Sequence, residues 1–295
     1  MKLRFSKYEG LGNDFLLVSR EDVLGLAGAL TPAEVARLCD RHFGVGGDGV
    51  LIVGSGPDGL WMNVINADGS TPEMCGNGLR CVALYLIDEG LVTERRFVVQ
   101  TDAGPHTVEV DRTSADTALV KVEMRPASLA AGEVLRDASG EWIERTFSCD
   151  NRDFAMTAVS MGNPHAVLFQ AGGFSPAEMA ALGPRIEKDP RFSAGANVGF
   201  ARLESPTKLD LTVWERGVGF TLACGTGACA AAVAAVETGR SPRGSELTVQ
   251  LPGGPLRIRV GERAAPIEMT GPARRVFDGE VVVGGAASRP GQAAG

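Results

Sequence analysis

The pattern Cys75-Gly76-Asn77-Gly78 recurs half a chain later as Cys224-Gly225-Thr226-Gly227, and each copy opens an apolar run that predicts a helix, over 79–87 and over 228–236. A cysteine just before a helix start lies at the positive end of the helix dipole, where the thiolate is favoured. The glycines leave the backbone N–H groups of the first turn open to an anion. The repeated pattern therefore predicts two thiols that face one small acidic ligand.

The two cysteine stretches belong to a longer internal repeat. Met161-Gly162-Asn163-Pro164-His165 echoes Leu11-Gly12-Asn13-Asp14-Phe15, and Ser175-Pro176-Ala177-Glu178 echoes Thr31-Pro32-Ala33-Glu34. The latter two stretches predict helix starts, each with an N-cap, an early proline and a glutamate that closes a capping box. Runs bounded by turn residues predict strands in matching order: 2–8, 15–18, 50–53, 61–65, 96–101, 107–111 and 118–123 in the first half, and 197–201, 209–214, 246–251, 256–260 and 266–270 in the second.

The repeat predicts two similarly folded domains of mixed α and β structure, whose equivalent loops face each other across a cleft. The first domain spans 1–124 and the second spans 150–275, and a polar, irregular linker joins them at 125–149. A last strand at 276–283 is predicted to cross back to the first domain. The tail at 284–295 is rich in Gly, Ala, Pro and Ser, and is predicted to be disordered.

Composition narrows the classes of function. The chain has 295 residues, 44% of them hydrophobic, and a net charge of −7, so no basic footprint for nucleic acid is present. An anionic substrate must be held by local positive features, such as helix ends or a buried Arg. The N-terminus lacks the apolar region of a signal peptide. The longest apolar run, 228–236, is far shorter than a membrane helix. We expect a cytoplasmic protein with no membrane partner.

The six cysteines do not predict a disulfide framework, which belongs to small secreted domains. Their spacing is not that of zinc ligands, and the chain has only three histidines, so no metal site is expected. Cysteine is among the most buried residue types, and packing is the expected role of four of the six. These four are Cys39, Cys81, Cys149 and Cys229.

Two facing thiols can invert a carbon that lies α to a carboxylate. Inversion needs a base on one face of the carbon and an acid on the other, and a thiolate paired with a thiol supplies both. Helix N-termini are expected to lower the pKa of the thiols and to stabilise the charge that develops on the carboxylate. No metal or carbonyl cofactor is then required. The sequence has no P-loop, no dinucleotide fingerprint in a βαβ unit and no clear pyridoxal lysine site.

Further polar residues stand near the ends of predicted strands. The asparagines Asn13, Asn66, Asn163 and Asn197 all lie at strand-to-loop junctions, where turn chemistry alone also explains them. Arg216 is a candidate clamp for a distal carboxylate, with a plain surface arginine as the alternative. His165 and Glu215 are candidates for tuning the thiols, although a lone histidine is more often structural. Asp14, Asp48 and Asp68 have no assigned role.

Taken together, these motifs resemble diaminopimelate epimerase, over residues 1 to about 280 and in the right order. The resemblance implies conversion of L,L-diaminopimelate to the meso isomer, in lysine and peptidoglycan-precursor synthesis, without pyridoxal phosphate or metal. It implies two pseudo-symmetric α+β domains, each a sheet curled around a central helix, with the active site between them. The stretches that carry it are 10–15, 43–52, 66–70, 75–81, 161–165, 215–217 and 223–227.

By motif match, the resemblance makes Cys75 and Cys224 the two bases of opposite hand. It gives His165 and Glu215 the role of modulating these thiols, and Glu215 also contacts the substrate. The backbone of Gly76, Asn77, Gly225 and Thr226 would hold the reacting carboxylate. The side chains that would hold the substrate, mainly at its other end, are Asn13, Asn66, Asn163, Asn197 and Arg216.

The sequence departs from the family pattern at Gly49, where some members carry a substrate-contacting Gln, so that contact is not assigned. Members of the family can form homodimers, and a homodimer is an open alternative here. Two rival functions are a proline-racemase-like or other cofactor-independent isomerase on the same scaffold, and a redox or binding module built on a cysteine pair. Arg216 and the asparagines favour a substrate with a second amino-acid end.

Overall fold

The computed structural model describes residues 1–26, 28–57, 59–72 and 74–284. Apart from Gly284, the tail that was predicted to be disordered lies outside the described residues. The first half of the chain contains β1 (Lys2–Gly10), β2 (Asn13–Ser19), α1 (Arg20–Gly25), α2 (Pro32–Cys39), β3 (Gly49–Gly56), β4 (Gly59–Asn66), α3 (Gly76–Asp88), β5 (Arg96–Thr101), β6 (Gly104–Arg112) and β7 (Thr117–Met124).

The second half begins with a short 3-10 turn and then repeats the order of the first half, with the extra strands β8 and β13 and without a counterpart of α1. Its elements are η1 (Ala131–Glu133), β8 (Arg145–Cys149), β9 (Arg152–Ser160), β10 (Pro164–Phe169), α4 (Pro176–Glu187), β11 (Asn197–Ser205), β12 (Lys208–Glu215), β13 (Gly219–Phe220), α5 (Gly225–Glu237), β14 (Glu246–Leu251), β15 (Gly254–Arg259) and β16 (Ile267–Val282).

The internal repeat appears in the strand pairing. In the first half β1 pairs antiparallel with β2, β2 parallel with β3, β3 antiparallel with β4, and β4 parallel with β5. The strands β9, β10, β11, β12 and β14 repeat these directions one by one. A parallel pair needs a crossover, and each crossover here contains a helix, α2 and α3 in one half and α4 and α5 in the other. The predicted pair of pseudo-symmetric α+β halves is confirmed.

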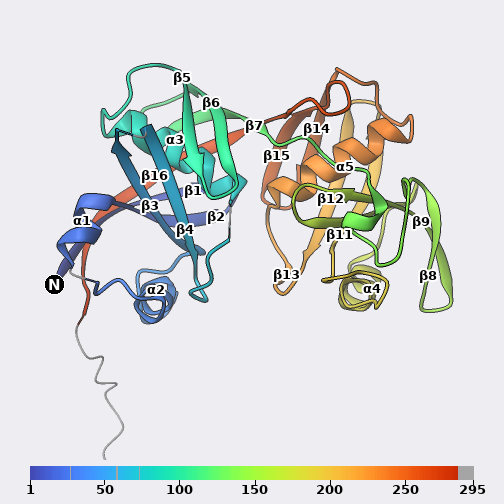
Figure 1. The fold of residues 1–295 in the computed structure, drawn as a ribbon, viewed down its shortest axis with the longest axis horizontal. Coiled ribbons are helices and arrows are strands. Elements are labelled where there is room, and N and C mark those ends of the chain that lie inside the picture. Colours follow the sequence, from blue (N-terminus) through green and yellow to red (C-terminus); the bar gives the residue numbers. More distant parts are fainter. Residues whose placement is uncertain (27, 58, 73, 285–295) are drawn as a thin grey trace, which may run out of the picture.

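Each half wraps its sheet around one central helix, as Figure 1 shows for α3 and α5. In the first half β1 also pairs with β16, so the strands from β1 to β7 close into a ring with β16 around α3. In the second half β8 is an end of the sheet. The smaller helices α2 and α4 lie at corresponding ends of the two halves.

The central helices are enclosed, and most of their residues are apolar or small and are buried. From Ala228 to Ala235 every residue of α5 is buried, and six of the eight are alanine, which lets the strands approach closely. Residues of both α3 and α5 belong to one hydrophobic core, which continues through β7 and β16. The two halves therefore share a core, and two satellite cores lie under α2 and α4.

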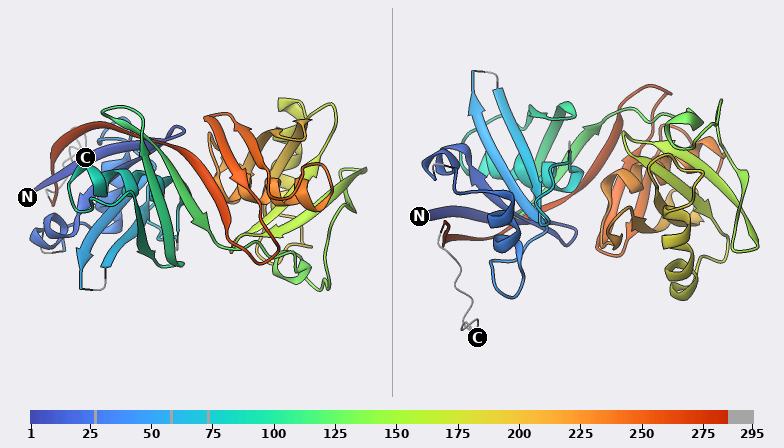
Figure 2. Two further views of the ribbon diagram at one scale, coloured as in Figure 1. Left: turned by 90° about the horizontal axis from the view of Figure 1, so that it is seen from above. Right: turned by 60° about the horizontal axis from the view of Figure 1, so that its bottom comes forward.

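One long strand joins the halves. Two strands are predicted at 266–270 and 276–283, and this is wrong, because β16 runs unbroken through Gly271-Pro272. Its pairing with β15 ends at Thr270 and its pairing with β1 begins at Arg274, while β7 pairs with its other edge from Ile267 to Arg274. Proline, which donates no ladder hydrogen bond, stands where that edge changes partner. Figure 2 shows β16 running from one half into the other.

Other local differences have local causes. Thr31 caps α2, but Glu34 does not close the capping box, because its carboxylate binds the Arg37 side chain and the Gly284 N–H. At Ser175 the capping box is complete. The segment 125–149 is not irregular throughout, since it contains η1 and β8. The sequence also left α1, β9, β10 and β13 unassigned.

The domain boundaries at 124 and 150 stay a prediction. Over the part of the chain that the structure describes, the helices are too short or too polar to cross a membrane.

Replacing Gly271 by alanine is expected to lower the free energy of unfolding by about 1–3 kcal/mol, as overpacking does. The added methyl group would lie 2.3 Å from Leu256 Cδ2 and 3.1 Å from Arg80 Nε. Denaturant unfolding measures the effect. The matched control is Gly56→Ala, also in a strand but with no atom within 4 Å, which should be neutral or stabilise by up to about 1 kcal/mol. Equal effects of the two substitutions would contradict the packing argument.

Candidate active site

Each cysteine of the repeated pattern caps the N-terminus of a central helix. Cys75 and Cys224 have extended backbones and directly precede α3 and α5. The Gly78 N–H donates to Cys75 Sγ over 3.4 Å, and the Gly227 N–H donates to Cys224 Sγ over 3.3 Å. A methyl group at Gly227 would lie 3.1 Å from Cys224 Sγ, so the glycine keeps the cap open. Both thiols therefore lie against the first turn of the helix that follows them.

A side-chain amide links the two cysteine loops. The Asn77 Nδ2 group donates to Ala223 O and to Asn13 Oδ1, each over 3.1 Å. Ala223 precedes Cys224, and Asn13 Oδ1 lies 4.0 Å from Cys75 Sγ. Asn77 Oδ1 is buried and has no hydrogen-bond partner among the described residues. Asn77 thus holds the start of α3 against the start of α5, and its oxygen is an acceptor available to a ligand.

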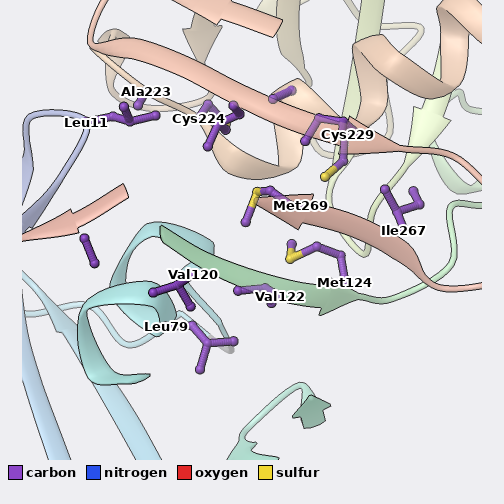
Figure 3. Close-up of a cluster of buried hydrophobic side chains, with 14 of the residues drawn as sticks. Leu11, Leu79, Val120, Val122, Met124, Ala223, Cys224, Cys229, Ile267 and Met269 are labelled. Carbon is purple, nitrogen blue, oxygen red and sulfur yellow. The ribbon is translucent and has the colours of Figure 1, made fainter. Parts of the chain in front are cut away.

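The same methionine lies beside the first glycine of both loops. A methyl group at Gly76 would lie 3.1 Å from Met269 Cε, and one at Gly225 would lie 3.3 Å from Met269 Sδ. Figure 3 shows Met269 of β16 next to Met124, between the segment that carries Leu79 and the segment that carries Cys224. β16 therefore sets the spacing of the two cysteine loops, because its Met269 side chain packs against the backbone of a glycine in each loop.

Burial governs the charge state of both thiols. Burial raises the pKa of Cys75 and of Cys224, although the Gly78 and Gly227 N–H groups each lower it. The expectation that the helix starts leave the thiols with a lowered pKa is therefore wrong, because desolvation outweighs the N–H groups. Glu215 adds its negative charge, which raises the pKa of both cysteines. In this state the site holds thiols, and a thiolate needs a further positive group.

Glu215 lies next to Cys224. The Cys224 thiol donates to its carboxylate, and the Thr221 hydroxyl donates to Glu215 Oε1 over 2.5 Å. Burial nevertheless raises the pKa of Glu215. Thr226 Oγ1, the equivalent of Asn77 in the second loop, lies 3.6 Å from Cys224 Sγ. The Thr226 hydroxyl lowers the pKa of Cys224, but burial and the charge of Glu215 outweigh it and keep the thiol protonated.

The two asparagines of the first half have different surroundings. Asn13 lies beside the cysteine loops, and Asn66 lies in the turn that follows β4. Asn13 Nδ2 donates to Asp48 Oδ2 over 2.6 Å, which orients its oxygen toward Cys75 and Asn77. Asn66 Nδ2 donates to Ser70 Oγ over 2.9 Å within the turn that follows β4. The structure therefore brings Asn13 to the thiols, whereas, among the described residues, the Asn66 side chain hydrogen-bonds within its own turn. Gly49 could not carry a side chain, since a methyl group there would lie 2.6 Å from Ile65 O.

The second-half residues form a connected network beside Thr226. Asn163 Nδ2 donates to Thr226 Oγ1 over 3.3 Å, and Asn163 Oδ1 lies 3.0 Å from His165 Nε2. His165 is 1% exposed. Burial, and secondarily the charge of Arg216, lowers the pKa of His165 from 6.5 to about 3. The histidine is therefore neutral, donates from Nε2 and orients Asn163; it acts on Cys224 at most through Asn163 and Thr226.

Arg216 is anchored by its backbone and by one arm of its guanidinium. Asn197 Oδ1 accepts the Arg216 N–H over 3.0 Å, and Arg216 Nη1 donates to Ala194 O over 2.9 Å. The buried Glu187 supports this turn from α4, because its carboxylate accepts the Gly217 N–H over 2.9 Å and the Trp214 indole N–H over 2.7 Å. The end of β12, which carries Glu215 and Arg216, is thereby fixed.

The remaining cysteines pack in the core. Cys39, Cys81 and Cys229 are buried and Cys149 is half-buried, all as free thiols. Burial raises the pKa of Cys39 to about 11 and that of Cys229 to about 12. The described residues contain no cluster of three or more His, Cys, Asp or Glu that could hold a metal ion.

Sequence reasoning missed several residues of the site. Asp48 had no assigned role, and Thr221, Glu187, Met269 and the buried Arg80 were not considered as part of it. The sequence did contain a signal for Asp48, because this residue follows a glycine loop. Its carboxylate accepts hydrogen bonds from Asn13 Nδ2 and from the Asp14 N–H. The partners of the others depend on which segments the fold brings together, and the sequence has no signal for that.

The family that matches this chain matches it in two segments, one in each half. The sequence profile of the family described as diaminopimelate epimerase matches residues 5–130 and 157–276. Diaminopimelate epimerase 1 of Nostoc sp. is 43% identical over 288 residues, which cover 95% of this chain and 100% of the relative. Diaminopimelate epimerase of Desulforudis audaxviator is 45% identical over 285 residues, which cover 95% and 99%. The resemblance in the motifs is confirmed.

Solved structures of other isomerases share the fold. A probable proline racemase from Agrobacterium radiobacter has a TM-score of 0.67 at 15% identity, over 95% of this chain and 93% of that one. A hydroxyproline epimerase from Agrobacterium vitis has a TM-score of 0.65 at 14% identity, over 95% and 92%. At this level of identity the likeness shows the fold alone.

Neutral, buried His165 should make stability depend on pH. The unfolded chain takes up a proton near pH 6.5, but the folded protein does so only near pH 3. Stability is then fully present above pH 6.5 and falls by about 1.4 kcal/mol per pH unit below it. His165→Gln should remove this slope between pH 6.5 and 4.5, as measured by denaturant unfolding. His42→Gln, at an exposed position, is the control, and a wild-type slope in the His165 variant would contradict the assignment.

Proposed function

Because this chain belongs to the diaminopimelate epimerase family, we propose that it is an isomerase that converts L,L-2,6-diaminopimelate to the meso isomer. The observation that carries the proposal is the pair of equivalent helix starts, each capped by a cysteine, which Asn77 and Met269 hold against each other. The product serves lysine and peptidoglycan-precursor synthesis. A cytoplasmic location and a homodimer stay predictions.

The proposed reaction removes a proton from one face of the α-carbon and adds a proton to its other face. A thiolate on one face takes the α-proton, so that an S–H bond forms and a C–H bond breaks, and the electron pair spreads into the carboxylate. The thiol on the other face then gives its proton to the same carbon, and its sulfur becomes the new thiolate. The numbers of protons and electrons in the site are unchanged, and the centre is inverted. Cys75 and Cys224 are the proposed pair, and either can start.

Negative charge on the carboxylate needs donors that are already in place. The first-turn N–H groups of α3 and α5 are such donors, and the glycine pairs Gly76/Gly78 and Gly225/Gly227 keep side chains away from them. We assign the reacting carboxylate to the backbone of Gly76, Asn77, Gly225 and Thr226. This arrangement stabilises the additional negative charge that the carboxylate gains as the proton leaves, more than it stabilises the carboxylate of the bound substrate.

The other end of the substrate is assigned to groups around the second loop. Arg216 offers a guanidinium whose backbone and one arm are already anchored, which suits a carboxylate. The amides of Asn13, Asn66, Asn163 and Asn197, with Glu215, complete the proposed site. Glu215 and His165 act on Cys224, the first through direct contact and the second through Asn163 and Thr226.

The two rival functions are less well supported. A proline-racemase-like isomerase shares the fold, but the likeness of such structures is at 15% identity, whereas that of named diaminopimelate epimerases is at 43% to 45%. A redox module would not need two glycine-lined helix starts. Proline also lacks the second amino-acid end that would engage Arg216.

The experiment that tests the proposed function measures the incorporation of deuterium from heavy water into the substrate. The reduced wild-type protein, incubated with L,L-diaminopimelate in heavy water, should incorporate deuterium at an α-carbon and form the meso isomer, as read by NMR and chiral chromatography. Cys75→Ala and Cys224→Ala should each lower turnover by at least about 100-fold, since general acid–base groups contribute on the order of 10²–10⁴.

Cys149→Ala is the matched control, because Cys149 is a half-buried cysteine that packs away from the site. It should keep wild-type turnover. No exchange with diaminopimelate by the wild-type protein would refute the proposed function, and exchange with proline instead would establish the first rival.

A further inference from the structure

The two equivalent asparagines of the internal repeat, Asn13 and Asn163, present opposite ends of their amides to the site. Asn13 Oδ1 accepts from Asn77 Nδ2 over 3.1 Å and lies 4.0 Å from Cys75 Sγ. Asn163 instead turns its Nδ2 group to Thr226 Oγ1, over 3.3 Å. At this position the first half therefore offers a hydrogen-bond acceptor, and the second half offers a donor.

The direction of each amide follows from the group on its other side. Asp48 is a carboxylate and can only accept, so it binds Asn13 Nδ2, over 2.6 Å, and leaves the Asn13 oxygen to the site. His165 donates from Nε2 to Asn163 Oδ1, over 3.0 Å, and leaves the Asn163 N–H groups to the site. An amide held by an acceptor and an amide held by a donor point in opposite directions.

These two orienting residues are exchanged between the halves. The parallel pairing of β2 with β3 has the same register as that of β10 with β11, so position 15 corresponds to 165 and position 48 corresponds to 196. The first half has the apolar Phe15 and the acidic Asp48 at these positions, whereas the second half has His165 and the apolar Ala196. Each half thus keeps one orienting group, an acceptor in the first and a donor in the second.

The Asp48 carboxylate is itself held by further donors. Its Oδ2 also accepts the Asp14 N–H over 3.0 Å, and its Oδ1 accepts from Arg41 Nη2 over 2.8 Å. The backbone of Asp48 is held independently, because its N–H donates to Asp14 O over 2.7 Å and its carbonyl accepts the Ala67 N–H over 3.0 Å. The carboxylate is therefore fixed beside the Asn13 amide, and its removal would leave the loop anchored.

One carboxylate thus sets the direction of two amides in a row. Because the Asn13 oxygen faces inward, Asn77 offers it an N–H group, and the Asn77 oxygen is left over. This oxygen is buried, has no partner among the described residues, and would lie 3.7 Å from a methyl group at Gly225, the first residue of α5. A buried acceptor without a partner is costly unless a ligand supplies a donor. The only hydrogen-bond donors of diaminopimelate at neutral pH are its ammonium groups.

We propose that Asp48 is a positioning residue, which directs the oxygens of Asn13 and Asn77 toward an ammonium group of the substrate. Asp48 acts through Asn13 and does not itself touch the substrate. In the second half His165 fixes the opposite direction of the equivalent amide. This role rests on the proposed function in its choice of ligand, whereas the direction of the amides can be measured without substrate.

The first test measures the Asn13 amide in the absence of substrate. In protein labelled with nitrogen-15 asparagine, one Asn13 Nδ2 proton should exchange with solvent at least about tenfold more slowly in wild type than in Asp48→Ala, because a hydrogen bond to a charged group is lost. An Asn13→Ser sample assigns the signal. Arg41→Met is the matched control, since it removes one partner of Asp48 but leaves the bond between Asp48 and Asn13, and it should keep the slow exchange.

The second test separates substrate binding from loss of folded protein. Asp48→Ala should raise KM for L,L-diaminopimelate about tenfold and change kcat less than about threefold, because the lost contact holds the substrate and the transition state alike. Partial unfolding would instead lower the apparent kcat and leave KM unchanged. Asp48→Asn keeps an oxygen that can accept from Asn13 and should return KM to within about threefold of wild type. Arg41→Met should keep both constants within about twofold, since its contact with Asp48 is exposed.

Two outcomes would overturn the role of Asp48. One is fast exchange of both Asn13 Nδ2 protons in the wild-type protein, which means that the carboxylate does not hold the amide; this result needs no variant, so it decides even if Asp48→Ala fails to fold. The other is an Asp48→Ala protein that has lost the slow exchange but keeps the wild-type KM, which means that the amide direction does not serve the substrate. Absence of turnover in the wild type would refute the proposed function and leave the measured amide direction standing.

Discussion

The pairing of β16 with both halves is the interaction on which the site depends. Its first part hydrogen-bonds to β15 and β7, and the part from Arg274 onward hydrogen-bonds to β1, so one strand belongs to the sheets of both halves. Met269 in this strand packs against the first glycine of each cysteine loop. The same strand, β16, thereby fixes the positions of both α3 and α5. Two freely hinged domains would not fix the two helix starts relative to each other in this way.

Burial and helix dipoles compete at the two sulfurs, and burial prevails. The N–H groups of Gly78 and Gly227 stabilise a thiolate, yet the pKa of both cysteines is raised by loss of water. The same dryness strengthens every charge interaction within the site. A buried guanidinium or carboxylate a few residues away therefore matters more here than it would at a surface. In such a site the placement of one charge can decide which sulfur is ionised, where the helix start alone cannot.

Much of this architecture was predictable, because short stretches of the sequence indicate it. The Cys-Gly-polar-Gly repeat, the two proline-led helix starts and the turn-bounded strands predicted two similar halves and placed both cysteines before helices. The continuity of β16 was not predictable, since Gly271-Pro272 is a strong break signal unless an edge changes partner there. The Asn77 bridge to Ala223 and the Glu187 support of β12 join residues far apart in the chain. Local pattern carries no information about such pairs.

A symmetric scaffold suits a reaction whose two half-steps mirror each other, but a symmetric distribution of charge would not. Two equal thiolates would leave no proton to give, and two equal thiols would leave no base. One of each is required, and a scaffold with exact chemical symmetry would hold both arrangements equally, so half of the molecules would face a given isomer with the wrong sulfur ionised. Glu215 breaks that degeneracy, because its carboxylate ends β12 and accepts a hydrogen bond from Cys224, whereas the equivalent strand β4 ends in the neutral Asn66. The fold supplies the two faces, and these few unmatched residues supply the difference between them.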